Sequence, residues 1–241
     1  MGYCPDGTPS PLGEPDDSSN KSLSNCDLFA NLTPLDVGFI IGLGGSGGVG
    51  PGVTVGIEMV YDLYDFEVDG FVYGGGAAVW GGSVTGYVGF VSGWRYFPAD
   101  IGVENYTGPF VSFGVGYQLF SGQVLMGPPS TDGGRMAGAL LGAGPSGKME
   151  FRGVKLPSIP GSPSLGVPVY KTFGEISQAF GLGSGSSKIA FHQAGTRKDI
   201  TVADGIAFAS YLGQTLSSSP QLAQMMQSIV IYNALAWESQ S

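Results

Sequence analysis

Residues 53–63, VTVGIEMVYDL, decide the fold class, because large apolar side chains recur there at every second position. These bulky positions are Val53, Val55, Ile57, Met59, Tyr61 and Leu63. The alternate positions are Thr54, Gly56, Glu58, Val60 and Asp62. A period of two over this length predicts a half-buried β-strand.

The same alternation recurs along the first half of the chain. It is clear in residues 37–43 and 111–119 and looser in residues 84–91. Glycine-rich breaks that suit hairpin turns lie at residues 44–52, 74–76 and 81–82. Consecutive strands with short links predict a mainly β fold: an antiparallel, glycine-rich meander, closed as a barrel or packed as a sandwich, followed by a short C-terminal helical region.

One strand face is made of small residues and needs a physical reason. In residues 111–119, Ser112, Gly114 and Gly116 alternate with the bulky positions. Glycine within a strand costs about 0.5–1 kcal/mol relative to alanine. We expect the bulky face to fill the interior, so that the glycine face points outward and packs closely against a helix or a second subunit.

The composition divides the chain into three parts. Residues 1–33 form a polar leader, in which Cys4 and Cys26 are predicted to form a disulfide. Residues 34–160 form the β domain, with further strands expected around 136–143 and 148–155. Residues 161–241 are expected to form an irregular, proline-rich linker and a helical hairpin that docks on the β domain.

Three local signals mark helix starts in the last part. Thr172 with Glu175 forms a capping-box pattern, and Thr201 with Asp204 forms a looser one that opens a helix to about Leu216. The last helix is expected to begin with Ser219 and Pro220. Its core face is predicted to be Leu222, Met225 or Met226, Ile229, Asn233 and Trp237.

The charge distribution argues against nucleic acid as a partner. The net charge is −9, and residues 1–94 hold eleven acidic residues against one basic residue, Lys21. An acidic surface repels a phosphate backbone. We expect no cofactor, since GLGGSG at 42–47 lacks the helix that a dinucleotide site requires.

Asp65, Glu67 and Asp69 are candidate calcium ligands. They alternate along DFEVDG and approximate the opening of an EF-hand loop. The match fails at the twelfth position, which is Gly76 instead of glutamate. The prevailing interpretation is an acidic, solvated hairpin tip.

His192 and Asp199 are the candidate catalytic pair. His192 is the single histidine, and a histidine near an aspartate can serve as a general base. No serine elbow of the G-x-S-x-G type stands out as a partner for this histidine, so a packed or surface histidine is the prevailing interpretation.

Residues 34–120 resemble the tails of bacterial YD-repeat (RHS-type) exported proteins. The segments that carry the resemblance are TPLDVGFIIGLGGSGGVGPGVTVGIEMVYD, GFVYGGGAAVWGGSVTGYVGF and ENYTGPFVSFGVGYQL. Those tails also alternate glycine with valine. The resemblance implies export and a role at a cell surface, and it transfers no catalytic residue.

These observations favour a non-enzymatic module, extracellular or at the cell surface, that binds a protein partner or self-associates through its β surface. Three alternatives stay open: a membrane-active β protein, a soluble barrel with a small apolar ligand, and a small hydrolase or toxin centred on His192. The helical residues at the C-terminus weigh against a membrane barrel, because outer-membrane barrels usually close on a strand.

Overall fold

The computed structural model describes residues 32–97, 102–117, 119–130, 132–144, 146–147, 162–183, 185–193 and 197–240. Cys4, Cys26 and the strand expected around 148–155 lie outside the described residues. The chain forms two compact units. The β unit comprises residues 36–62 and 67–190, and the helical unit comprises residues up to Leu35, residues 63–66 and residues 191–241.

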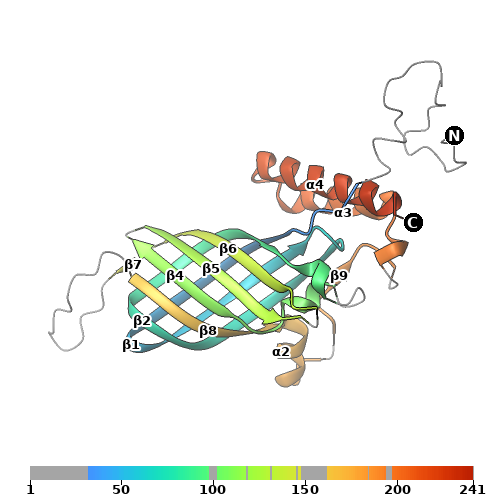
Figure 1. Cartoon of the computed structure of the whole chain (residues 1–241). Coiled ribbons are helices and arrows are strands. Elements are labelled where there is room, and N and C mark those ends of the chain that lie inside the picture. Colours follow the sequence, from blue (N-terminus) through green and yellow to red (C-terminus); the bar gives the residue numbers. More distant parts are fainter. Residues whose placement is uncertain are drawn as a thin grey trace, which may run out of the picture. The chain divides into compact units, whose positions relative to one another are not determined.

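The β unit confirms the predicted mainly β, antiparallel fold and is a closed barrel (Figure 1). Its strands are β1 (Gly38–Asp62), β2 (Glu67–Ser92), β3 (Gly108–Pro109), β4 (Val111–Tyr117), β5 (Phe120–Pro129), β6 (Arg135–Ala143), β7 (Ser146–Gly147), β8 (Ser162–Thr172) and β9 (Ile189–Ala190). It also contains helix α2 (Phe173–Ala179) and the 3-10 helices Trp94–Tyr96 and Gly102–Tyr106.

Hydrogen-bonded pairing closes the sheet through β2, β6, β5, β4 and β8, and back to β2. The long strand β1 pairs with β2 along its whole length. Two close approaches show that β1 also folds back on itself. Thr54 Oγ1 donates to the Gly45 carbonyl oxygen, and a Cβ on Gly48 would clash with Gly52. The two halves of β1 therefore lie side by side between the two halves of β2 and complete the wall.

The structure corrects two expectations about strand boundaries. β8 lies in the segment predicted to be a linker, yet it pairs with β2 and β4. Pro163 and Pro168 interrupt its alternation of Leu165, Val167 and Val169 and conceal the strand signal. Residues 74–76, predicted to form a turn, instead run within β2 between β1 and β8.

The expectation that the glycine face points outward is wrong. In β4, Ser112, Gly114 and Gly116 are buried, whereas the bulky residues Val111, Phe113, Val115 and Tyr117 are exposed. The physical reason is the small cross-section of the barrel, which cannot hold a large side chain from every strand at every level.

Inward glycines make room for a few inward tyrosines. A Cβ on Gly44 or Gly56 would overlap the Tyr73 side chain, and one on Gly42 would overlap the Tyr87 ring. Small residues on one strand thus match large residues on its neighbours, as small barrels require.

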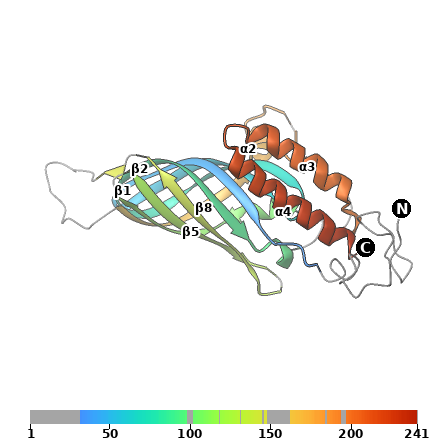
Figure 2. The same cartoon turned by 90° about the horizontal axis from the view of Figure 1, so that it is seen from above.

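The helical unit contains α3 (Val202–Thr215) and α4 (Pro220–Glu238), which lie side by side (Figure 2). Capping boxes at Thr201 and, in the β unit, at Thr172 confirm those predicted helix starts. Pro220 begins α4 as predicted, although Ser219 makes no side-chain cap hydrogen bond. The predicted docking of the helices on the β unit stays a prediction.

The core face of α4 is close to the predicted one, with two corrections. Leu222 is only half-buried, and its neighbour Ala223 is buried instead. Ile229 is likewise only half-buried, and its neighbour Val230 is fully buried instead. The buried residues of α4 are Ala223, Met226, Val230, Asn233, Ala234, Ala236 and Trp237.

Asn233 joins three segments of the helical unit. Its Nδ2 donates to the carbonyls of Leu35 (3.0 Å) and Leu63 (2.6 Å), and its Oδ1 accepts from the Leu35 amide (2.7 Å). Trp237 Nε1 donates to the Tyr64 carbonyl (2.8 Å). The β1–β2 connection, residues 63–66, is therefore a structural part of the helical unit.

Two adjacent methionines in α4 provide a matched test of this packing. Met226 is fully buried and Met225 is 45% exposed. We predict that Met226→Ala lowers the free energy of unfolding by about 2–5 kcal/mol, because it leaves a cavity. Met225→Ala should change it by less than about 0.5 kcal/mol. Urea unfolding followed by circular dichroism at 222 nm measures both, and equal effects would contradict the packing.

Candidate functional site

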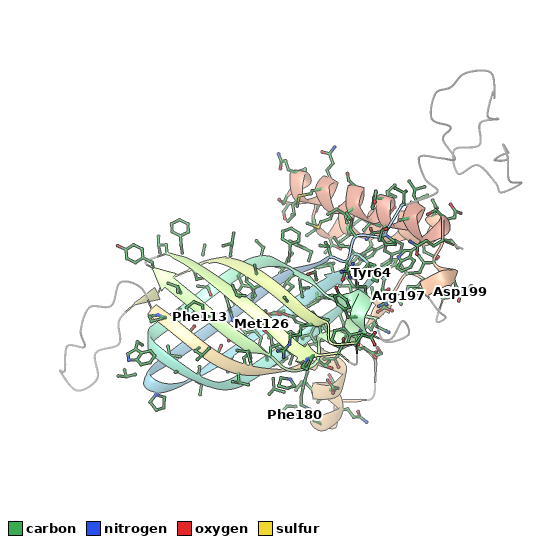
Figure 3. The ribbon with its side chains drawn as sticks, viewed as in Figure 1. Tyr64, Phe113, Met126, Phe180, Arg197 and Asp199 are labelled. Atoms are coloured by element: carbon green, nitrogen blue, oxygen red, sulfur yellow. The ribbon has the colours of Figure 1, made fainter. Side chains whose placement is uncertain are left out.

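The outer wall of the barrel is a continuous apolar surface. Its exposed large apolar residues are Leu43, Val53, Val55, Ile57, Trp80, Val84, Val88, Phe90, Val111, Phe113, Val115, Tyr117, Phe120, Val124, Met126, Leu141, Leu165, Val167 and Val169. Side chains stand outward around the wall in Figure 3, which labels Phe113 and Met126. This surface, called the apolar wall below, covers both halves of β1, the second half of β2, and β4, β5, β6 and β8.

Charged residues are nearly excluded from the apolar wall. Among the described residues of the wall strands, the exposed charged residues are Arg135 and Lys171, and the acidic ones are buried. Arg135 begins β6, and Lys171 is the second-last residue of β8. The register places both at the rim where β1 ends and β2 begins, which we call the charged rim.

The opposite rim carries exposed aromatic residues. Tyr117 ends β4 and is paired with Phe120 at the start of β5. Trp80 lies at the junction of the first and second halves of β2, and its side chain is 44% exposed. Phe120 is 72% exposed. The wall is thus apolar along its height, with aromatic residues at one rim and basic residues at the other.

Inside the barrel, one buried glutamate is held by tyrosines. Glu58 is 2% exposed. Its Oε1 accepts hydrogen bonds from Tyr87 (2.6 Å) and Tyr170 (3.4 Å), and its Oε2 accepts one from Tyr106 (2.8 Å). Tyr87 Oη is also within hydrogen-bond distance, 3.2 Å, of Tyr73 Oη. We call these five residues the Glu58 cluster.

Aromatic packing seals the interior around the Glu58 cluster. The Gly102–Tyr106 helix brings Tyr106 into the barrel, where it is fully buried. Its ring contacts Phe71, Phe110 and Tyr170 at centroid distances of 4.9–5.2 Å. A segment from outside the wall strands therefore plugs the half of the interior nearer the charged rim.

The other half of the interior is small and polar. A cavity of about 50 Å³ is lined mainly by serine, threonine and glycine, including Ser46, Thr85 and Ser164, with Tyr73 and Tyr87 also contributing. This volume suits one or two water molecules.

The predicted calcium ligands do not converge. Among the described residues, no group of three potential ligands has metal-binding geometry. Asp65, Glu67 and Asp69 are 1–3% exposed, so the predicted solvated tip is also wrong. Asp69 accepts a hydrogen bond from the Gly70 amide (2.6 Å).

Two basic residues from distant sequence positions pair with the other two acids. In the β unit, Lys188 Nζ lies 3.4 Å from Glu67 and 3.6 Å from Glu104. Burial lowers the pKa of Lys188, but the two carboxylates outweigh it and raise this pKa above its usual value. In the helical unit, Arg197 binds both Asp65 oxygens (2.5 and 2.9 Å) and lies over the Tyr64 ring.

The predicted catalytic pair gains no further support as an active site. His192 Nδ1 lies 2.9 Å from the Gln193 carbonyl oxygen. Asp199 ends the 3-10 helix Arg197–Asp199 and is exposed. The role of this pair as a general base and its partner stays a prediction.

Sequence reasoning missed the Glu58 cluster and the position of Lys171 at the charged rim. A signal for the first was present, since Glu58 is the single charged residue between Asp36 and Asp62. A lone acid on the small face of a strand indicates a polar partner across the interior. The partners themselves come from up to 112 positions away, which no local pattern shows.

No helix among the described residues is long and apolar enough to cross a membrane. Comparison of the chain with models of known protein families and with curated proteins finds no match.

The Glu58 cluster gives a test of the interior. Glu58→Ala leaves buried tyrosine hydroxyls without their acceptor, at about 1–3 kcal/mol for each. We predict a loss of several kcal/mol in the free energy of unfolding. Glu58→Gln retains one oxygen acceptor and should lose clearly less. Urea unfolding followed by tyrosine and tryptophan fluorescence compares the two, and equal losses would show that the carboxylate oxygens do not hold the cluster.

Proposed function

We propose that the β unit is a membrane-inserted barrel, with the apolar wall in contact with lipid, and that it anchors the chain at a cell surface. The barrel acts as an anchor, and its plugged interior does not conduct ions. This proposal takes up the membrane alternative and retains the expected surface location.

The observation that carries the proposal is the direction of the side chains. Bulky apolar residues point outward on β1, β4, β5, β6, β8 and the second half of β2, while glycine, serine, threonine, the hydrogen-bonded Glu58 cluster and a few apolar residues such as Phe71 and Leu125 point inward. A barrel in water has the opposite arrangement, because apolar burial supplies its stability. Lipid-facing apolar residues that alternate with polar interior residues are typical of transmembrane barrels.

Strand length and backbone pairing support the same proposal. β5, β6 and β8 have 10, 9 and 11 residues, and a tilted transmembrane strand needs about 9–11. In lipid every backbone amide and carbonyl must find a partner within the protein, and a closed sheet supplies these partners. Basic residues at one rim and aromatic residues at the other fit the two membrane interfaces.

The main competing functions for this fold have less support. A soluble barrel for an apolar ligand needs an apolar cavity of a few hundred Å³, but the interior cavity is about 50 Å³ and polar. A self-associating soluble module would have to cover the whole circumference of the wall, since an exposed apolar patch on a monomer is normally only a few hundred Å². Lipid covers all sides at once.

The direct experiment is flotation with vesicles. The full chain is refolded into phosphatidylcholine vesicles and centrifuged through a density gradient. We expect the protein to float with the lipid and to stay there after a carbonate wash, because the wall is embedded. Protein that remains at the bottom of the gradient as a soluble, folded species would contradict the proposal.

Depth along the wall gives a sharper prediction. Val124 pairs with Phe113 in the middle strand region, whereas Leu119 lies in the turn at the aromatic rim. An arginine on the lipid face destabilises a transmembrane barrel by about 2–4 kcal/mol at the bilayer midplane but by only about 0–1 kcal/mol near the interface. Val124→Arg should therefore strongly reduce insertion, and Leu119→Arg should insert like the wild type.

Insertion in both variants is measured by flotation and by the temperature at which the barrel unfolds on a denaturing gel. Equal insertion of the two variants would mean that the wall does not face a bilayer.

A further inference from the structure

An open trough runs along the outer surface of β2, between β1 and β8. Pairing places Gly74 between Val55 and Val169, and Gly76 between Val53 and Val167. The four valines are 43–59% exposed. The glycine trough, as we call Gly74 and Gly76 with these valines, therefore has a floor without side chains and two apolar sides.

Nothing within the described part of the chain requires glycine at these two positions. Neither residue has a positive φ angle. A Cβ on Gly76 would meet no atom within 4 Å, and one on Gly74 would make only ordinary contacts at 3.8 Å or more. Since glycine weakens a strand, its repetition here points to an object that lies in the space above the floor.

The outer face of β2 continues from the trough toward the charged rim, and there it is already covered by an apolar side chain of this chain. Gly70 precedes the trough on the outer face of β2, and a Cβ there would overlap the Phe173 ring of α2. Further along, Val55, Val169 and Ile176 of α2 line an apolar groove of about 600 Å³. The chain therefore covers Gly70 with its own aromatic ring and leaves the outer face of β2 open from Gly74 onward.

A positive charge lies where the groove reaches the charged rim. Lys171 lines the groove, is exposed, and forms an outward row with Val72 and Ile57. Strands are about 4.8 Å apart, so the valine sides of the trough are about 10 Å apart, with only hydrogen atoms on the floor between them. The trough therefore has room for one extended hydrocarbon chain, with the Lys171 ammonium group at its charged-rim end.

We propose that the glycine trough and Lys171 form a binding site for one phospholipid, with an acyl chain in the trough and the headgroup phosphate on the lysine ammonium. The inference rests on the proposed membrane location and adds a specific lipid site to it. A lysine near the membrane interface reaches the headgroup level with its ammonium while its methylene stem stays on the apolar wall.

The test uses a phosphatidylglycerol that carries a photoactivatable group in its acyl chain, mixed into phosphatidylcholine vesicles that hold the full-length protein. After illumination and proteolysis, mass spectrometry locates the attached lipid. We expect attachment to the β1 and β8 residues that flank Gly74 and Gly76. Attachment spread evenly around the wall would overturn the site.

Variants separate the trough from general lipid contact. Gly74→Leu and Gly76→Leu fill the floor and should reduce attachment at these residues several-fold. Gly86→Leu is the matched control, since Gly86 also lies in β2, a Cβ added there would meet no atom within 4 Å, and its neighbours across the sheet are Leu43 and Ala143. It should leave attachment at the trough unchanged.

Lys171→Gln removes the charge without changing the wall. It should weaken phosphatidylglycerol binding about tenfold, which corresponds to the loss of one charge-assisted contact of about 1.4 kcal/mol. If wild type and Lys171→Gln label equally at the trough, or if Gly76→Leu labels like Gly86→Leu, the lipid site is wrong although the barrel is still inserted. If the wild type does not float with vesicles, the membrane location itself is wrong.

Discussion

The structure depends on one steric constraint, the narrow cross-section of the closed sheet. Only a few large side chains fit inside at each level, among them tyrosines whose neighbours across the wall are glycines. Many of the remaining large residues of the wall strands therefore point outward. The apolar wall is therefore a direct consequence of closing a short-circumference sheet made of alternating bulky and small residues.

Closure also explains why part of the interior is polar. With many of its apolar residues outside, the barrel is stabilised from within by hydrogen bonds and by a local apolar and aromatic core. Glu58 supplies the acceptors, and tyrosines from β2, β8 and the Gly102–Tyr106 helix supply the donors. The Gly102–Tyr106 helix contributes one of these donors, Tyr106. The segment that fills this half of the interior therefore also provides a hydrogen bond to the buried carboxylate. This coupling is the reason why we propose an anchor and not a pore.

The sequence predicted what depends on neighbours in the chain. Period-two alternation located β1 and β4, and the side chains of Thr172 and Thr201 located two helix starts, because both signals are local. Alternation shows that a strand has two different faces but not which one is inside, since that depends on the curvature of the whole sheet. The glycine face was assigned to the wrong side for this reason.

Long-range pairing was the other limit. The acidic residues near the β1–β2 connection have few basic residues close in sequence, and so they suggested calcium or solvent. Their partners Arg197 and Lys188 arrive from more than 100 positions away. β8 was missed because its prolines obscure a pattern that its outward valines otherwise keep.

The central claim, that the bulky face meets lipid, is tested most directly by nitroxide scanning of residues 164–169 of β8 in vesicles, after the two native cysteines are replaced by serine. Power-saturation spectroscopy measures how often each label collides with oxygen, which concentrates in lipid, and with a water-soluble nickel complex. The account predicts high oxygen and low nickel accessibility at the odd-numbered positions, alternating with restricted labels at the even-numbered ones. High nickel accessibility at the odd-numbered positions would contradict it, because the wall would then face water.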